Sequence, residues 1–283
     1  PTPPVPTPPV PTPPVPTPPV DTNGEYMELH RSLDFPQRPR IAIVPDPDSY
    51  DDVKSHIIPA KEGVSMWKSQ LEQKYGGDWN VDFYVIKPGQ SFFENKIKPD
   101  IIMHIITNDE KIDCKSKFIG LSETNTKKPV NAWVCSTYKN EKRSDSDVSA
   151  TSAHEFIHAI GLGHTFNKKN DLMCSSEDGK DTCPGTYSKS TNPSELNLEA
   201  TAKLYGVDGF RNPNNSVADG ELFAFNNPAN INSPKPMPDP DLSKDIDNDE
   251  IPDIDDLCDS YAETWNGYYD NDGCTDSKPQ STP

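Results

Sequence analysis

Three of the six histidines in this chain lie within eleven residues, at a spacing that suits a metal site. His154 and His158 are four residues apart, so on a helix they share one face and both imidazoles can reach one ion. Gly161 tolerates a positive φ and lets the chain leave that helix, which brings His164 back as a third ligand. Three protein ligands leave one coordination position open, the arrangement of a catalytic zinc site.

Glu155 follows the first histidine directly, where a carboxylate stands beside the metal rather than on it. From there it can take a proton from a water on the metal and pass it to a leaving amine. The expected chemistry is zinc-assisted hydrolysis with Glu155 as general base. The other three histidines, His30, His56 and His104, are expected to be ordinary structural residues.

Residues 154–164 (HEFIHAIGLGH) resemble the metzincin zinc peptidases, whose motif is HExxHxxGxxH followed by a methionine turn. Every fixed position matches, and residues 170–174 (NDLMC) resemble the turn. The resemblance implies that Met173 forms an apolar floor under the imidazoles and is not a ligand. It also implies an endopeptidase whose substrate binds as an added strand along an upper edge strand, for which we expect residues 118–123.

The segments around the motif predict a mixed α/β (α+β) domain. Strands are expected over residues 40–47, 78–86, 100–107 and 131–137, and helices over 61–75, 147–161 and 192–206. The last helix should begin with Asn192 as N-cap, Pro193 at its first position and Glu195 at its third. The resemblance, which covers about residues 40–206, implies a zincin fold: a twisted mixed sheet over an active-site helix, and a small C-terminal helical subdomain like that of the matrixin branch.

Four copies of PTPPV make up residues 1–20. Proline blocks helix formation, so this segment is expected to be an extended polyproline II spacer. A ligand for an SH3-like domain is the less favoured interpretation, and a spacer suits a tether to a cell surface. The expected catalytic domain covers residues 21–210, followed by a linker over 211–240, of which residues 222–225 (LFAF) suit a contact with the domain.

An acidic segment follows the linker, with 14 acidic residues and a single lysine between positions 239 and 276. Acids at alternate positions place several oxygens around one point, which suits Ca²⁺. Residues 241–276 resemble a thrombospondin type 3 repeat, an irregular calcium-binding fold that precedes a tail over 277–283. The resemblance implies a Cys258–Cys274 bridge and five calcium ligands, Asp245, Asp247, Asp249, Asp253 and Asp256. A solvated, disordered acidic tail is the alternative.

Charge and cysteine content restrict the class of protein and its compartment. The net charge of −18 argues against a nucleic-acid partner. The six cysteines include no CxxC pair and favour disulfides, hence an oxidising, extracellular location. They allow 15 connectivities, among which the sequence does not choose, and our hypothesis is nearest-neighbour pairing: 114–135, 174–183 and 258–274. No apolar run reaches the roughly 20 residues that span a bilayer.

Two other functions stay open at this level. One is a zinc hydrolase that acts on something other than protein, against which the family resemblance argues. The other is a calcium-dependent cell-surface or adhesion module whose zinc domain is inactive or narrowly specific. The presence of Glu155 argues against an inactive domain, because such a domain has no need of the base. The favoured partners are therefore protein or peptide substrates.

Overall fold

The computed structural model describes residues 24–30, 33–35, 38–92, 97–115, 119–123, 127–177, 180–183 and 192–224, together with 248 and 262. The PTPPV spacer, the five expected calcium ligands and the expected Cys258–Cys274 bridge lie outside the described residues. The helices are η1 (Pro47–Ser49), α1 (Tyr50–Val53), η2 (Lys54–His56), α2 (Ile57–Tyr75), α3 (Asp145–Ala159) and α4 (Glu195–Tyr205).

The main sheet has five strands in the order β3-β2-β4-β6-β5. Four of them run parallel, and β5 pairs antiparallel with β6 at the edge. The strands are β2 (Arg40–Pro45), β3 (Asp82–Val85), β4 (Ile101–Ile106), β5 (Gly120–Ser122) and β6 (Val130–Cys135). The expected mixed sheet is therefore present, with all four expected strands.

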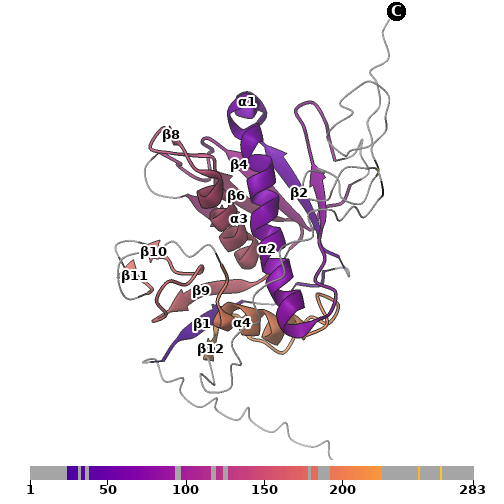
Figure 1. Cartoon of the computed structure of the whole chain (residues 1–283), viewed down its shortest axis with the longest axis vertical. Helices are drawn as coiled ribbons and strands as arrows, with labels where there is room; N and C mark the ends of the chain where they lie inside the picture. Colours follow the sequence, from indigo (N-terminus) through magenta and orange to yellow (C-terminus); the bar gives the residue numbers. More distant parts are fainter. Residues whose placement is uncertain are drawn as a thin grey trace, which may run out of the picture.

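Helices α2 and α3 lie side by side on one face of this sheet (Figure 1). They approach so closely that a Cβ on Gly63 of α2 would lie 2.1 Å from the carbonyl oxygen of Ser149 on α3. Their apolar side chains join the main core with residues such as Trp67 and Phe156. The helix that carries the metal motif is thus fixed by a neighbouring helix and by the sheet.

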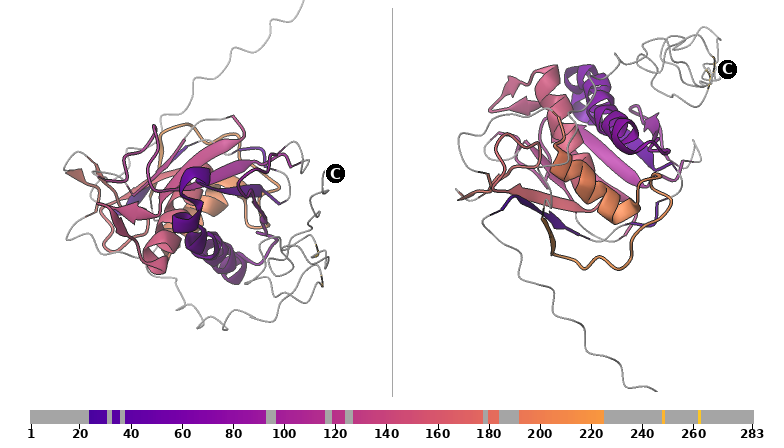
Figure 2. Two further views of the ribbon diagram at one scale, coloured as in Figure 1. Left: turned by 90° about the horizontal axis from the view of Figure 1, so that it is seen from above. Right: turned by 60° about the horizontal axis from the view of Figure 1, so that its bottom comes forward.

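A second sheet, β12-β1-β9, packs against α4 at the other end of the molecule (Figure 2). Its strands are β1 (Tyr26–Leu29), β9 (Leu162–Phe166) and β12 (Glu221–Ala224), all antiparallel. Phe223 packs against the main core, as the apolar run at 222–225 led us to expect. Residues 211–224 therefore continue the globular domain, and the linker expected to begin at 211 does not begin there.

Two pairings of two-residue strands and several boundary shifts complete the description. Short hairpin strands are β7 (Thr137–Tyr138) with β8 (Glu141–Lys142), and β10 (Ser176–Glu177) with β11 (Lys180–Asp181).

Helix α2 begins at Ile57 rather than 61, because Pro59 is tolerated within a first turn. Strand β3 begins at Asp82 rather than 78, and Tyr84 is buried as well as Phe83, since a parallel strand is covered on both faces.

The N-termini of two helices differ from the expected positions. Helix α3 begins at Asp145, where the hydroxyl of Ser144 accepts a hydrogen bond from Asp147 N. Helix α4 is capped by Ser194 rather than Asn192, because Asn197 completes a reciprocal capping box with Ser194. Glu195 is consequently the first residue of the helix and not the third.

Two disulfides occur among the described residues, Cys114–Cys135 and Cys174–Cys183. Both match the nearest-neighbour hypothesis. The first ties the loop before β5 to the end of β6, and the second closes the small lobe that contains β10 and β11. Within the described part of the chain, no helix is long and apolar enough to cross a membrane.

Candidate metal centre

The structure brings His154, His158 and His164 together, as their spacing predicted. Their ligand atoms all lie within 4.8 Å of one another. The Nε2 atom of His158 lies 3.0 Å from that of His154 and 3.2 Å from that of His164. Two ligands come from successive turns of α3, and the third comes from β9 after the turn at Gly161, whose φ is 100°.

Backbone carbonyl groups determine which ring nitrogen faces the centre. The Nδ1 atom of His154 lies 2.8 Å from the carbonyl oxygen of Leu172, and that of His158 lies 2.8 Å from the oxygen of Leu162. A carbonyl oxygen can only accept, so each Nδ1 carries the hydrogen. In a neutral ring, Nε2 then carries no hydrogen, and its lone pair can bind a metal.

The convergence of these lone pairs fits a cation. Unprotonated Nε2 atoms at 3.0 Å cannot hydrogen-bond to each other and repel unless a positive charge lies between them. Zn–N bonds of about 2.0–2.1 Å at tetrahedral angles place nitrogen ligands roughly 3.3–3.4 Å apart, close to the observed separations. The donor set, three imidazoles, is also one that zinc accepts.

The protonation state of the three rings agrees with that role. Burial lowers the pKa of His154 and takes the pKa of His158 well below its usual range. Burial, with a smaller effect from the neighbouring His154, lowers the pKa of His164 to about 3. All three imidazoles are therefore neutral at neutral pH, which is the form that binds a metal.

A β-bulge aims His164 at the centre. Strand β1 pairs Met27 with Thr165 and Leu29 with Leu162, so two residues of β9 face the single Glu28 between them. The two are Gly163 and His164. A Cβ on Gly163 would lie 2.8 Å from the Cβ of Glu28, so only glycine fits beside β1 at this point. The motif allows any residue at the position of Gly163. In this protein that position is restricted to glycine by β1, a strand that is distant in sequence but pairs with β9.

The segment expected to be the methionine turn contacts the ring of His154 on the side away from the other two histidines, at Nδ1. Leu172 supplies the carbonyl group that binds His154, and the amide of Met173 donates to the Asp171 carboxylate over 2.8 Å. The Met173 carbonyl accepts from Thr165 N over 2.9 Å and so joins the turn to β9. Met173 itself is fully buried in the main core. Its role as a floor for the imidazoles stays a prediction.

Glu155 points toward the edge strand β5. Its side chain is buried, and a Cβ on Gly120 would lie 2.2 Å from Glu155 Oε1 and 2.7 Å from the Thr151 methyl group. Thr151 and Glu155 are one turn apart on α3, so the β5 backbone runs directly over this row of side chains. An edge strand is therefore present within the expected residues 118–123, as β5 (Gly120–Ser122), and it lies against the candidate base; residue 118 is outside the described residues.

The remaining histidines are held by the fold. His56 is fully buried and contacts Ser136 Oγ at 2.7 Å through Nδ1. His104 lies 3.1 Å from the amide oxygen of Asn131 and stacks on Trp133, as a hydrogen-bonded strand residue should. His30 contacts the carboxylate of Asp219 at 3.0 Å. None of the three belongs to the histidine cluster.

Neither a protein-family model nor a curated protein matches this chain. The site is therefore interpreted from its geometry and from the motif. Three of its supporting residues were missed at the sequence level: Gly120, Gly163 and Asp171. Only Asp171 carried a local signal, because Asn-Asp pairs favour turns.

Proposed function

We propose that this protein is a zinc-dependent endopeptidase. The observation that carries the proposal is the convergence of three histidine Nε2 atoms, two of them on the helix that also carries the buried Glu155. His154, His158 and His164 would hold the metal. A bound zinc ion lowers the pKa of a water to about 7 and polarises a carbonyl group.

Glu155 supplies the proton transfers in this proposal. It accepts a proton from the attacking water and delivers it to the amine of the leaving peptide. Its position beside Gly120 keeps the carboxylate on the side of α3 that faces β5. Cleavage of a peptide bond requires both transfers, which a single carboxylate can perform in succession.

The edge strand supports a polypeptide substrate. β5 pairs with β6 on one side only, so among the described strands its other side offers backbone groups to an added strand. A substrate bound there runs past Glu155, which lies beneath the same strand. An extended peptide fits this geometry better than a compact small molecule does.

The proposed location is extracellular, secreted or displayed at a cell surface. The two disulfides are compatible with an oxidising compartment. Structural calcium in residues 241–276 remains part of the proposal, on the sequence resemblance alone.

The test is cleavage of a mixed, denatured protein substrate by the zinc-loaded protein and by Glu155→Ala. We expect about one zinc per chain in both, and a rate loss of roughly 10²–10⁴-fold or more in the variant. Glu62→Ala, at an exposed glutamate of α2, is the matched control and should cleave normally. Wild-type protein that holds no zinc, or cleavage that survives Glu155→Ala, would contradict the proposal.

A further inference from the structure

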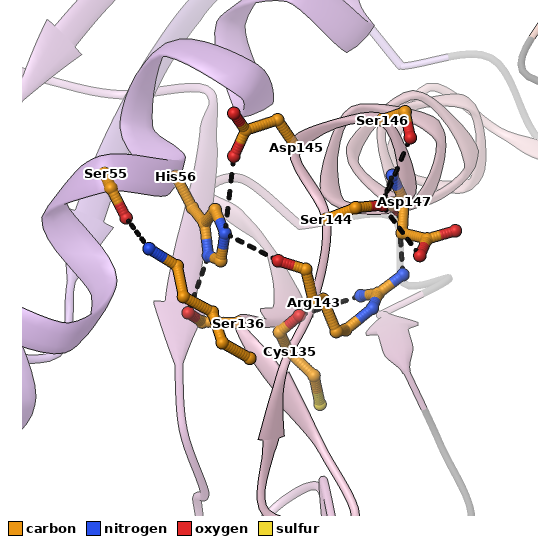
Figure 3. Close-up of polar contacts among 10 residues, drawn as sticks. Ser55, His56, Cys135, Ser136, Arg143, Ser144, Asp145, Ser146 and Asp147 are labelled. Atoms are coloured by element: carbon orange, nitrogen blue, oxygen red, sulfur yellow. Dashed lines mark hydrogen bonds and ion pairs between the residues drawn. The ribbon is translucent and has the colours of Figure 1, made fainter.

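Arg143 makes more side-chain contacts to the elements around Glu155 than its place in a surface turn would suggest. It lies between β8 and Ser144, the N-cap of α3 (Figure 3). Its Nη1 donates to the carbonyl oxygens of Cys135 at 2.7 Å and Ile119 at 3.3 Å. Its Nη2 donates to the Asp147 carbonyl at 2.8 Å and to Thr151 Oγ1 at 2.6 Å.

These four bonds join three elements through one planar group. Ile119 directly precedes β5, Cys135 ends β6, and Asp147 and Thr151 lie in the first turns of α3. The fork of the guanidinium fixes the directions of its donors, so it sets both distance and angle between the strands and the helix. A lysine, with a single charged nitrogen on a flexible stem, cannot do the same.

The contacts continue from Arg143 to the candidate base. Thr151 accepts from Arg143, and its methyl group lies against Gly120, the residue after Ile119. Gly120 in turn lies against Glu155 Oε1. A shift of β5 relative to α3 therefore changes the space available to the carboxylate of Glu155.

Charge contributes to the same arrangement. Burial lowers the pKa of Arg143, and the negative charges of Asp147 and Glu155 act in the opposite direction. The guanidinium thus lies within electrostatic reach of Glu155 while all four of its described bonds go to backbone or hydroxyl oxygens.

We infer that Arg143 is a positioning residue that fixes the spacing between the edge strand β5 and Glu155. This inference rests on the proposed function, because it holds that a substrate strand bound along β5 is aligned with the base by this one side chain. Arg143 does not touch the reacting atoms. It acts through Thr151 and through the backbone of residues 119 and 120.

The variant Arg143→Met should fold, because most of the oxygen atoms that lose the guanidinium as a donor keep another hydrogen-bond partner. The Ile119 carbonyl also accepts from Cys135 N, and the Asp147 carbonyl also accepts from the Thr151 hydroxyl. We expect unchanged zinc content and a KM within about threefold of the wild type. We expect kcat to fall by roughly 10²-fold, the effect of about 1 Å of misplacement. Arg143→Lys should recover only a small part.

A control separates positioning from general stability. Arg40→Met removes another partly buried arginine, the first residue of β2, whose Nε donates to the carboxylate of Asp100 just before β4. In the sheet order, β2 lies three strands away from β5. Arg40→Met should lower thermal stability and leave kcat per zinc-loaded molecule unchanged. A purely structural role for Arg143 would give the same result as Arg40→Met, and that outcome would overturn the inference.

A second measurement does not depend on activity. Amide hydrogen exchange in zinc-loaded Arg143→Met should accelerate at least tenfold in β5 and at Cys135 N, with α2 unchanged. Unchanged protection of β5 would overturn the inference whether or not the protein cleaves peptides. A wild type that binds zinc and cleaves nothing would count against the proposed function, while altered exchange would still establish that Arg143 holds β5.

Discussion

Gly163 lies where β1 passes closest to the third histidine, and its replacement by alanine tests how that histidine is held. The added Cβ would lie 2.8 Å from the Cβ of Glu28 and 3.0 Å from its carbonyl oxygen. Carbon atoms in good contact are about 3.5–4.0 Å apart, so the two strands must separate by at least about 0.7 Å. Metal–ligand distances are held within about 0.2 Å, so this displacement is large on the scale of a metal site.

The expected result is weaker zinc binding by Gly163→Ala. Overpacking of this kind costs about 1–3 kcal/mol, which corresponds to roughly 5- to 150-fold in an equilibrium constant. Competition with a chelating dye of known affinity measures the loss. Denaturant unfolding in excess EDTA measures separately how far the pairing of β1 with β9 is weakened in the metal-free chain.

A second substitution provides the control. Glu28→Gly removes the Cβ and Cγ atoms that meet the new methyl group, so the double variant Glu28→Gly/Gly163→Ala should recover most of the affinity. Wild-type affinity in Gly163→Ala would refute the reasoning. A loss that Glu28→Gly does not relieve would show that the contact with β1 is not its cause.

Two further predictions concern the fold. Gly63→Ala places a methyl group 2.1 Å from the Ser149 carbonyl oxygen, so it should lower the free energy of unfolding in urea by about 1–3 kcal/mol. The control Ser69→Ala, on the exposed face of α2, should change that free energy by less than about 0.5 kcal/mol. Burial lowers the pKa of His56, so His56 stabilises the fold fully above its unfolded pKa of about 6.5 and progressively less as pH falls. At pH 8 the free energy of unfolding of His56→Gln should be lower than that of the wild type, and between pH 7 and 5 it should fall by less than that of the wild type. An equal pH dependence of unfolding in the two proteins would contradict this.

The sequence predicted the parts of the site that depend on local geometry. Two histidines one helical turn apart must share a face, and Gly161 adopts the positive φ that its position required. The expected strands and helices were present because their apolar patterns are long and regular. The N-cap of α4 was misplaced by two residues, because Asn192 and Ser194 are both good caps and only the partner Asn197 decides between them.

The parts that could not be predicted depend on contacts between distant segments. Nothing near Tyr26–Leu29 indicates that this strand pairs with β9 and forces the bulge at Gly163. The contact between Gly120 and Glu155 likewise exists only once β5 lies over α3. Arg143 resembles any other surface arginine in the sequence, and its role depends on three carbonyl groups brought together by the fold.

The three-stranded sheet β12-β1-β9 also affects the order in which the chain can fold. It joins residues 26–29 to 162–166 and to 221–224, so it consists of contacts across long sequence separations, which form slowly. During synthesis the helix histidines leave the ribosome well before the last strand of this sheet. That last strand pairs with β1, and β1 in turn pairs with β9, the strand that carries His164. A chain truncated before β12 would therefore lack one of the two partners of β1, the strand that also pairs with the segment of the third imidazole.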